Sequence, residues 1–331
     1  MSPPTVGRLL KGLGYSLRVN AKQIEAASNH PERNQQFEYI ADQRAEFTRR
    51  QRPILSIDSK KKKELVGNFK NTGQAWVCEP TAVNVHDFPG DALGRAVPYG
   101  VYDLTNNRGF VYLGSSGDTP AFAADAIAAW WQTEGQLTWP TDDHLLLPAD
   151  AGGSNSCRTR AWKERLQVRV CDRFGLTVTV CHYPTGRSKW NPIERRLFSH
   201  ISNNWAGVPL RTWDTLLAFI RGTTTAHGLA VHAIFDDGNY PTGQQVTDAE
   251  MATLRIEPHA ICPQIGVGTG IAARPLHRSR RAELPHRAPA LRHDDKQFGR
   301  IRLHYLDSRY PARNQRLHPL PVHFASLAAA R

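Results

Sequence analysis

The chain has 331 residues, 40% of them hydrophobic, which is enough for one large domain or two smaller ones around a sizeable core. Its formal net charge of +12 favours an anionic partner, but segment 261–331 carries +9 of this charge and residues 1–260 only +3. The five cysteines show no CxxC spacing, no signal peptide precedes them, and no apolar run reaches the roughly 18 residues of a membrane span. A disulfide-rich secreted protein and a membrane protein are therefore excluded, and a reduced cytoplasmic setting is expected.

Two helices are predicted before residue 50. Residues 2–17 carry apolar side chains at helical spacing, and residues 31–49 begin with Pro31 in the first turn and present one apolar face. The first helix resembles the recognition helix of a helix-turn-helix, without the partner helix that would precede it. It either packs on the body or belongs to a DNA-binding domain whose start is absent. We expect residues 1–50 to be a helical segment, the remnant of a truncated helix-turn-helix.

The segment PILSIDSKKKKE, residues 53–64, combines a short apolar run with Asp58 at its polar end. Such a run predicts a buried strand. The basic residues Lys60, Lys61, Lys62 and Lys63 follow directly. An acid at the end of a buried strand beside a basic run suits metal-assisted chemistry on a polyanion. The alternative is a strand end that leads into a solvated lysine loop.

The body from residue 51 to 260 then alternates strands and helices, which predicts a mixed α/β domain. Thr119 and Pro120 open a helix, and Thr247 with Glu250 forms a capping box. Residues 65–98 are rich in turn residues and are expected to be irregular. The further predicted elements are a hairpin at 99–104 and 109–113, strands at 145–147, 176–181 and 229–235, and helices at 157–174, 191–205 and 212–220.

Three acids fall at corresponding places in this pattern. Asp58 ends the first strand, Asp150 follows the strand after the hairpin, and Glu194 lies in the first turn of a helix after the last of these strands. At one edge of a single sheet, the three carboxylates would suit two divalent cations, with Mg²⁺ preferred for its oxygen ligands. The alternatives are that Asp150 is a turn residue before two glycines and that Glu194 is half of a capping box with Asn191.

Several longer motifs resemble the insertion-sequence transposases of the ISAzo-thirteen type. They are a SIDSKKKELVGNFKN-like segment at 56–71 with one extra lysine, VNVHDFP at 83–89, AVPYGVYDL at 96–104, ADAGGSN at 149–155, CHYPTGRSKWNPIE at 181–194 and YPTG at 240–243. The NPIE segment also resembles the third-acid region of mariner-like DDE transposases. The resemblance spans residues 2–259, and it implies a ribonuclease-H-like catalytic domain at 51–260.

The resemblance further implies that Asp58, Asp150 and Glu194 are the catalytic DDE triad and hold two Mg²⁺ or Mn²⁺ ions. We expect Lys60, Lys61, Lys62, Lys63, Arg187, Lys189 and Asn191 to contact DNA. The implied partners are the DNA of the element's ends and of the target, and the active complex is expected to be a homodimer or larger. The implied location is the bacterial cytoplasm, in association with the nucleoid.

The predicted function is cleavage and strand transfer of an insertion sequence by two-metal phosphoryl transfer. Two alternatives stay open: a truncated, inactive remnant that at most binds DNA, and a ribonuclease-H-like repair nuclease without preference for the element's ends. Residues 261–331 contain twelve Arg and one Lys and show no sustained periodicity. We expect a basic tail of low order, read out of frame or selected as a DNA-tracking arm, with few contacts to the core.

Overall fold

A computed structural model of the chain describes residues 3–16, 33–60, 64–186, 188–259 and 269–271. The helices are α1 (Pro3–Gly12), α2 (Arg33–Arg49), α3 (Pro120–Trp130), α4 (Gln136–Thr138), α5 (Arg160–Leu166), α6 (Asp172–Phe174), α7 (Ser199–Asn204), α8 (Trp213–Arg221) and α9 (Asp248–Ala252). The strands are β1 (Leu55–Ser59), β2 (Glu64–Val66), β3 (Gly94–Asp103), β4 (Arg108–Gly114), β5 (His144–Ala149), β6 (Thr177–His182), β7 (Ala230–Asp236), β8 (Ile256–Pro258) and β9 (Thr269–Ile271).

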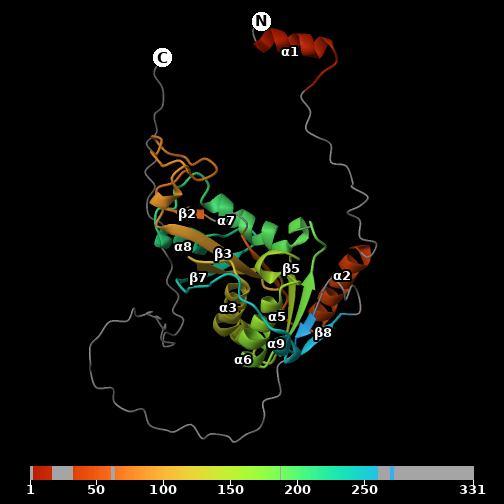
Figure 1. The fold of residues 1–331 in the computed structure, drawn as a ribbon. Coiled ribbons are helices and arrows are strands. Elements are labelled where there is room, and N and C mark those ends of the chain that lie inside the picture. The colour runs from red at the N-terminus through yellow and green to blue at the C-terminus, as the bar shows by residue number, and fades with distance from the viewer. Residues whose placement is uncertain (1–2, 17–32, 61–63, 187, 260–268, 272–331) are drawn as a thin grey trace, which may run out of the picture. The chain divides into compact units, whose positions relative to one another are not determined.

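The described strands form one mixed sheet in the order β7-β4-β3-β1-β5-β6-β9-β8, with β2 paired to β3. Strand β1 is antiparallel to β3 and parallel to β5, β3 is antiparallel to β4, and β5 is parallel to β6. Helices flank this sheet, and β5 lies between α2 and α5 in Figure 1. This strand order and these directions confirm the mixed α/β, ribonuclease-H-like fold expected from the sequence.

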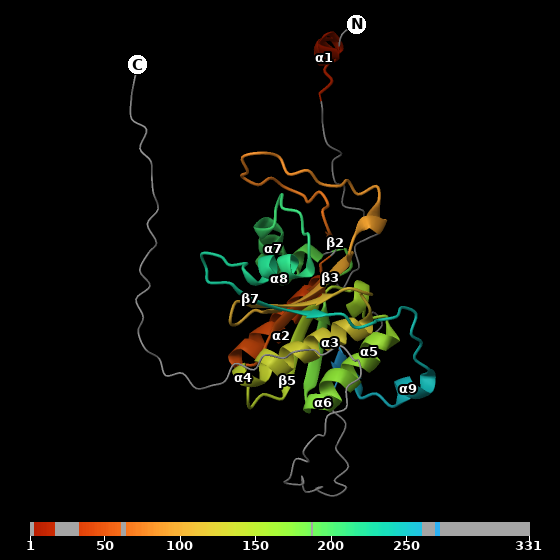
Figure 2. The same cartoon turned by 90° about the vertical axis from the view of Figure 1, so that its left-hand side faces the viewer.

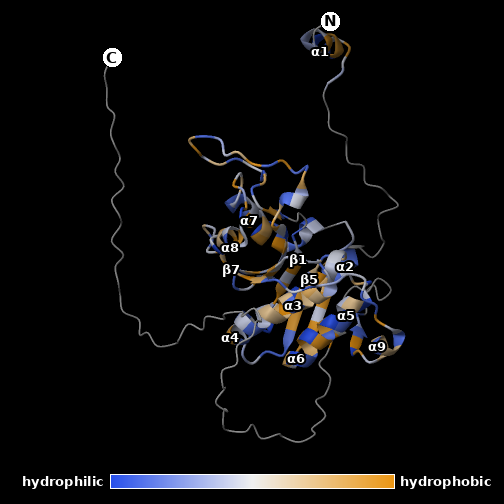
Figure 3. Cartoon of the chain, turned by 60° about the vertical axis from the view of Figure 1, so that its left-hand side comes forward, coloured by the Kyte–Doolittle hydropathy of each residue, from blue (hydrophilic) through white to orange (hydrophobic). Residues whose placement is uncertain are grey.

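The two faces of the sheet bury different sets of side chains because residues alternate along each strand. Leu55 and Ile57 of β1 pack with Phe122 of α3 and Trp162 of α5. Figure 2 shows these helices in front of the sheet. On the opposite face, Ile54 packs with residues of α2, β5 and β6. Figure 3 shows the apolar strands in orange behind helices that carry blue hydrophilic positions.

Most of the predicted elements are confirmed, including the hairpin of β3 and β4 and the strand that carries Asp58 near its end. The expectation that residues 65–98 are irregular is wrong at 94–98, because β3 already begins at Gly94. Thr119 caps α3 by accepting a hydrogen bond from the Phe122 N–H at 3.3 Å. The capping box of Thr247 and Glu250 is formed. Gly175 closes the helix before β6 with a positive φ of 73°. In each case the signal is local, so the sequence alone carries it.

The N-terminal helix is confirmed as α1, and its apolar side chains Val6, Leu9 and Leu10 are exposed. Whether this helix derives from a helix-turn-helix stays a prediction. No helix within the described part of the chain is long and apolar enough to cross a membrane.

The predicted beginning of the tail at residue 261 needs a correction. Residues 269–271 form β9, which pairs with β6 and β8, and Ile271 is fully buried in the core under α3 and α5. The sheet therefore continues past residue 260, and the sequence missed it because a three-residue strand has no measurable periodicity. The sequence also missed β2 and β8, for the same reason. The rest of the predicted tail lies outside the described residues.

Replacing Ile271 by Ala should lower the free energy of unfolding by about 2–5 kcal/mol, since a fully buried side chain is truncated. Urea unfolding followed by circular dichroism measures this loss. The matched control is Val85→Ala, at an exposed position, which should stay within about 0.5 kcal/mol of the wild type. An Ile271→Ala protein as stable as the control would support a core that ends near residue 260.

Candidate active site

Asp58 and Asp150 lie next to each other at the ends of two parallel strands. The pairings Ile54–Leu146 and Ile57–Ala149 keep one register between β1 and β5. That register puts Asp58 beside Asp150, with their backbones about 5 Å apart, the usual spacing of neighbouring strands. Asp58 is only 6% exposed, and Asp150 is half-buried. The structure therefore brings together the first two acids that the sequence singled out.

The segment that carries the third acid is bonded directly to β1. The side chain of Asn191 donates from Nδ2 to the Ile57 carbonyl at 3.0 Å and accepts a hydrogen bond from the Ser56 hydroxyl. The Ile193 N–H also donates to Ser56 Oγ, at 3.1 Å. Ser56 and Asp58 are two residues apart on a strand, so their side chains share one face of the sheet. Asn191 therefore joins the segment leading to Glu194 to the face on which Asp58 lies.

Gly100 keeps this face open for the same segment. It is the register partner of Asp58 on β3. A Cβ atom at this position would lie 2.7 Å from Ile193 Cδ1 and 2.8 Å from Phe198 Cζ. The absence of a side chain at Gly100 lets the helical turn Glu194–Phe198 approach the sheet beside Asp58. Glu194 begins this turn and is half-buried.

The register thus gives Asp58 and Asp150 one face and one edge of the sheet, and the segment that carries Glu194 approaches the same face. Among the described residues, no group of three or more His, Cys, Asp and Glu side chains is placed to hold a metal ion. The pair of Asp58 and Asp150 supplies the carboxylate oxygens that Mg²⁺ and Mn²⁺ prefer, on neighbouring strands. These residues suit a divalent cation in chemistry and in backbone placement.

A polar cluster behind this edge was not predicted from the sequence. The Ser59 N–H donates to Asp58 Oδ1 at 2.8 Å, and the Ser59 hydroxyl donates to Asp118 Oδ2 at 2.8 Å. The buried Tyr99 hydroxyl donates to Asn155 Oδ1 at 3.2 Å. Burial raises the pKa of Tyr99 well above its ordinary value, and the charges of Asp58 and Asp118 raise it further. The Tyr99 hydroxyl therefore stays neutral and donates a hydrogen bond from β3, where Tyr99 pairs with Ser59 at the end of β1.

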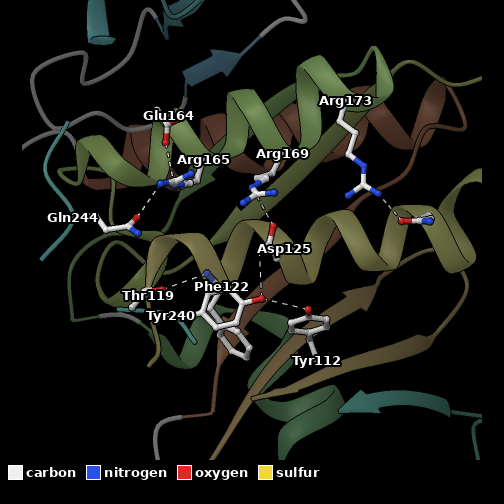
Figure 4. A network of polar contacts seen from close by, with 11 residues as sticks. Tyr112, Thr119, Phe122, Asp125, Glu164, Arg165, Arg169, Arg173, Tyr240 and Gln244 are labelled. Carbon is white, nitrogen blue, oxygen red and sulfur yellow. Dashed lines mark hydrogen bonds and ion pairs between the residues drawn. The ribbon is translucent and has the colours of Figure 1, made fainter. Parts of the chain in front are cut away.

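The YPTG motif at 240–243 holds the loop that contains Asp118. The Tyr240 N–H donates to Ser116 Oγ at 3.1 Å, and the Tyr240 hydroxyl donates to Asp125 Oδ2 at 3.3 Å. Figure 4 shows Tyr240 against Phe122, with Tyr112 and Asp125 beside its hydroxyl. The motif was evident in the sequence, but its contact with a loop more than a hundred residues earlier in the chain was not.

Of the lysine run, the structure describes only Lys60, and its environment differs from the predicted contact with DNA. Lys60 Nζ forms an ion pair with Glu64 Oε1 at 2.7 Å, and the two side chains are 9% and 6% exposed. The ammonium group also lies 5.2 Å from the ring centroid of Trp205. The positive charge of Lys60 is thus paired inside the protein and is not presented to DNA. Lys61, Lys62, Lys63 and Arg187 lie outside the described residues.

The two other predicted DNA contacts have opposite environments. Lys189, in the turn Ser188–Trp190, is exposed and stands two residues before Asn191 in the sequence. Asn191 is fully buried, and both ends of its side-chain amide bond to β1. Its side chain is therefore neither a DNA contact nor the cap of a box with Glu194. The sequence suggested both roles because Asn is common at helix starts.

Replacing Asn191 by Ala should destabilise the fold by about 2–5 kcal/mol, because the Ile57 carbonyl and the Ser56 hydroxyl both lose a buried partner. Urea unfolding measures the change. Asn34→Ala, on the exposed side of α2, is the control and should be nearly neutral. If Asn191→Ala is as stable as wild type but binds DNA more weakly, the residue contacts DNA as the sequence suggested.

Replacing Lys60 by Met should cost about 3–5 kcal/mol of stability, since the buried carboxylate of Glu64 then loses the ammonium group 2.7 Å away. The double variant Lys60→Met, Glu64→Leu removes both charges and should recover most of the loss. Thermal and urea unfolding of the three proteins test this cycle. A Lys60→Met protein of wild-type stability would mean that the ion pair is open in solution.

Comparison with known proteins gives one family match and several distant structural likenesses. The family model described as "Rhodopirellula transposase DDE domain" matches residues 1–267. None of the curated proteins matches the chain in sequence. The similar solved structures include the Mos1 transposase paired-end complex with the left transposon end, at 14% identity and a TM-score of 0.42. That match covers 64% of this chain and 60% of the Mos1 chain.

The crystal structure of the Mos1 strand transfer complex has 12% identity and a TM-score of 0.41, with coverage of 64% of this chain and 59% of that one. The paired-end complex with Mn has 13% identity and a TM-score of 0.37, with coverage of 65% and 61%. The chain thus spans about 60% of the length of these structures. The family match covers most of the chain, including all three acids. The chain therefore belongs to the Rhodopirellula transposase DDE domain family.

Proposed function

We propose that the chain is a DDE transposase that cleaves DNA at the ends of an insertion sequence and transfers the freed strand to a target. The observation that supports this most directly is the shared register of β1 and β5, which puts Asp58 beside Asp150. Two carboxylates on neighbouring strands repel each other, and a divalent cation between them would relieve this repulsion. Their pairing at the end of a buried strand therefore favours metal-assisted phosphoryl transfer.

Asp58, Asp150 and Glu194 would hold two divalent cations, Mg²⁺ or Mn²⁺. Bound at such a site, the cations activate the attacking oxygen and stabilise the leaving oxygen of a phosphodiester. Asn191 and Gly100 position the segment that carries Glu194, and Ser59 orients the Asp58 carboxylate through its N–H. These three residues would act by positioning, without contact to the phosphate.

Lys189 would contact a DNA phosphate beside the scissile bond, because it is exposed and lies in the turn Ser188–Trp190 that directly precedes Asn191. Such a contact gives affinity without reading sequence. For the active complex we propose two or more copies of the chain on DNA. We also propose that the protein acts in the bacterial cytoplasm at the nucleoid.

The test is strand nicking of a duplex that contains the element's end, with an unrelated duplex as reference. Wild type should nick the end duplex in Mg²⁺ or Mn²⁺ and much less in Ca²⁺, whose looser coordination suits in-line transfer badly. Asp58→Asn should reduce the rate by about 100-fold or more, which corresponds to several kcal/mol of lost transition-state stabilisation. The exposed control Asp91→Asn should keep the wild-type rate.

Each alternative has its own signature in this assay. A wild-type chain that binds the duplex but never nicks it is the inactive remnant. A chain that nicks both duplexes equally is a nuclease without preference for the element's ends. Asp58→Asn with the wild-type rate would remove that residue from the catalytic site.

A further inference from the structure

Trp190 is an exposed aromatic residue whose exposure neither the packing of the core nor the three acids explain. Its side chain is 51% exposed, although Asn191 and Ile193, one and three residues later, are fully buried. The turn Ser188–Trp190 is fixed at its end by the hydrogen bond from the Asn191 N–H to the Ser188 carbonyl, at 2.9 Å. A large aromatic ring is thus presented to solvent from a backbone that is tied to β1.

The ring of Trp190 is also restrained from the side. Its centroid lies 5.6 Å from that of Phe37 on α2, with the planes at 62°. Phe37 in turn lies 6.3 Å from Tyr183, the residue that follows β6. An edge contact of this kind holds the ring in place and leaves part of its surface free. The Trp190 ring is therefore exposed to solvent but held in one position, and we call this ring the platform.

The platform lies on the same face of the sheet as the acids. Tyr183 packs with Ile54 and Leu146, which share the face of Asp58 and Asp150 because they stand an even number of residues before them. Burial raises the pKa of Tyr183, and the charge of Asp150 adds to this, which places Tyr183 within electrostatic reach of that acid. On the other side, Asn191 bonds to the carbonyl of Ile57, next to Asp58.

We propose that Trp190 stacks on an unpaired nucleobase of the DNA strand held at the acidic edge, with Lys189 on an adjoining phosphate. This inference rests on the proposed function and adds the kind of DNA structure that the site takes. A base offers its face to a protein ring only when it leaves the duplex stack, so the ligand is a single-stranded or frayed end. Aromatic stacking beside a basic group accepts every base, and it suits a site that cuts and rejoins different sequences.

The experiment measures binding of the full chain to a fluorescent duplex with a short unpaired 3′ tail, in Ca²⁺, which can occupy a carboxylate site but suits strand cleavage badly. A second probe has the same phosphates but abasic sites in the tail. Trp190→Ala should weaken binding to the first probe by about 5- to 150-fold, the range of one base stack, and leave the second unchanged. Trp190→Phe should restore most of the affinity.

The matched control is Trp76→Ala, since Trp76 is fully exposed elsewhere on the chain, and it should bind both probes like wild type. A 2-aminopurine in the tail gives a direct signature, since its fluorescence is quenched by stacking on the wild-type indole and should recover in Trp190→Ala. If Trp190→Ala unfolds, Trp190→Phe and the abasic probe carry the comparison.

Equal weakening on both probes, or none on either, overturns the stacking role while DNA binding and the proposed function stand. A wild-type chain that binds neither probe overturns both. A change of oligomeric state in Trp190→Ala, measured by size-exclusion chromatography with light scattering, together with unchanged 2-aminopurine fluorescence, would instead make Trp190 a contact between copies of the chain.

Discussion

The side-chain amide of Asn191 is the contact on which the arrangement of the acids depends. Asp58 and Asp150 are brought together by strand pairing alone, but Glu194 belongs to a helical segment that no strand holds. The hydrogen bonds of Asn191 with Ser56 and Ile57 connect that segment to the strand of Asp58. They are fully buried, so water does not compete with them, and losing one leaves a costly unpaired group on β1.

The five residues of strand β1 place side chains alternately on the two faces of the sheet, and each face has different neighbours. Leu55, Ile57 and Ser59 face α3, where Ser59 bonds to Asp118. Ser56 and Asp58 face the segment of Asn191 and Glu194. A slip of one residue would turn the acid into the apolar core and an isoleucine toward the site, so the register is strongly specified. The apolar neighbours of β1 therefore fix the position of Asp58 as firmly as its polar contacts do.

The sequence was sufficient for elements with local signals and insufficient for contacts between distant segments. Caps, turns and apolar periodicity located α2, α3, α8 and the strands from β3 to β7, and the position of the acids at strand ends followed from them. The burial of Asn191 could not be predicted, since its partners are 134 and 135 residues away. The same is true of Lys60, which in the sequence is one lysine of four and in the structure pairs with Glu64 beside Trp205.

The use of Lys60 inside the protein changes how affinity for DNA has to be explained. Residues 1–260 carry a net charge of only +3, and the acidic edge itself repels phosphate until cations bind. In the described part of the chain, Lys189 before Asn191 and Arg195 and Arg196 after Glu194 are exposed basic residues, and a few contacts of this kind give a modest salt dependence. Affinity that phosphate contacts do not supply has to come from contacts that salt screens less. Metal coordination is one of these contacts, and stacking of a base on an exposed, immobilised indole is another. A base is free to stack on an indole only at a strand end or in a distorted strand, so this contact would favour the reactive end over ordinary duplex DNA.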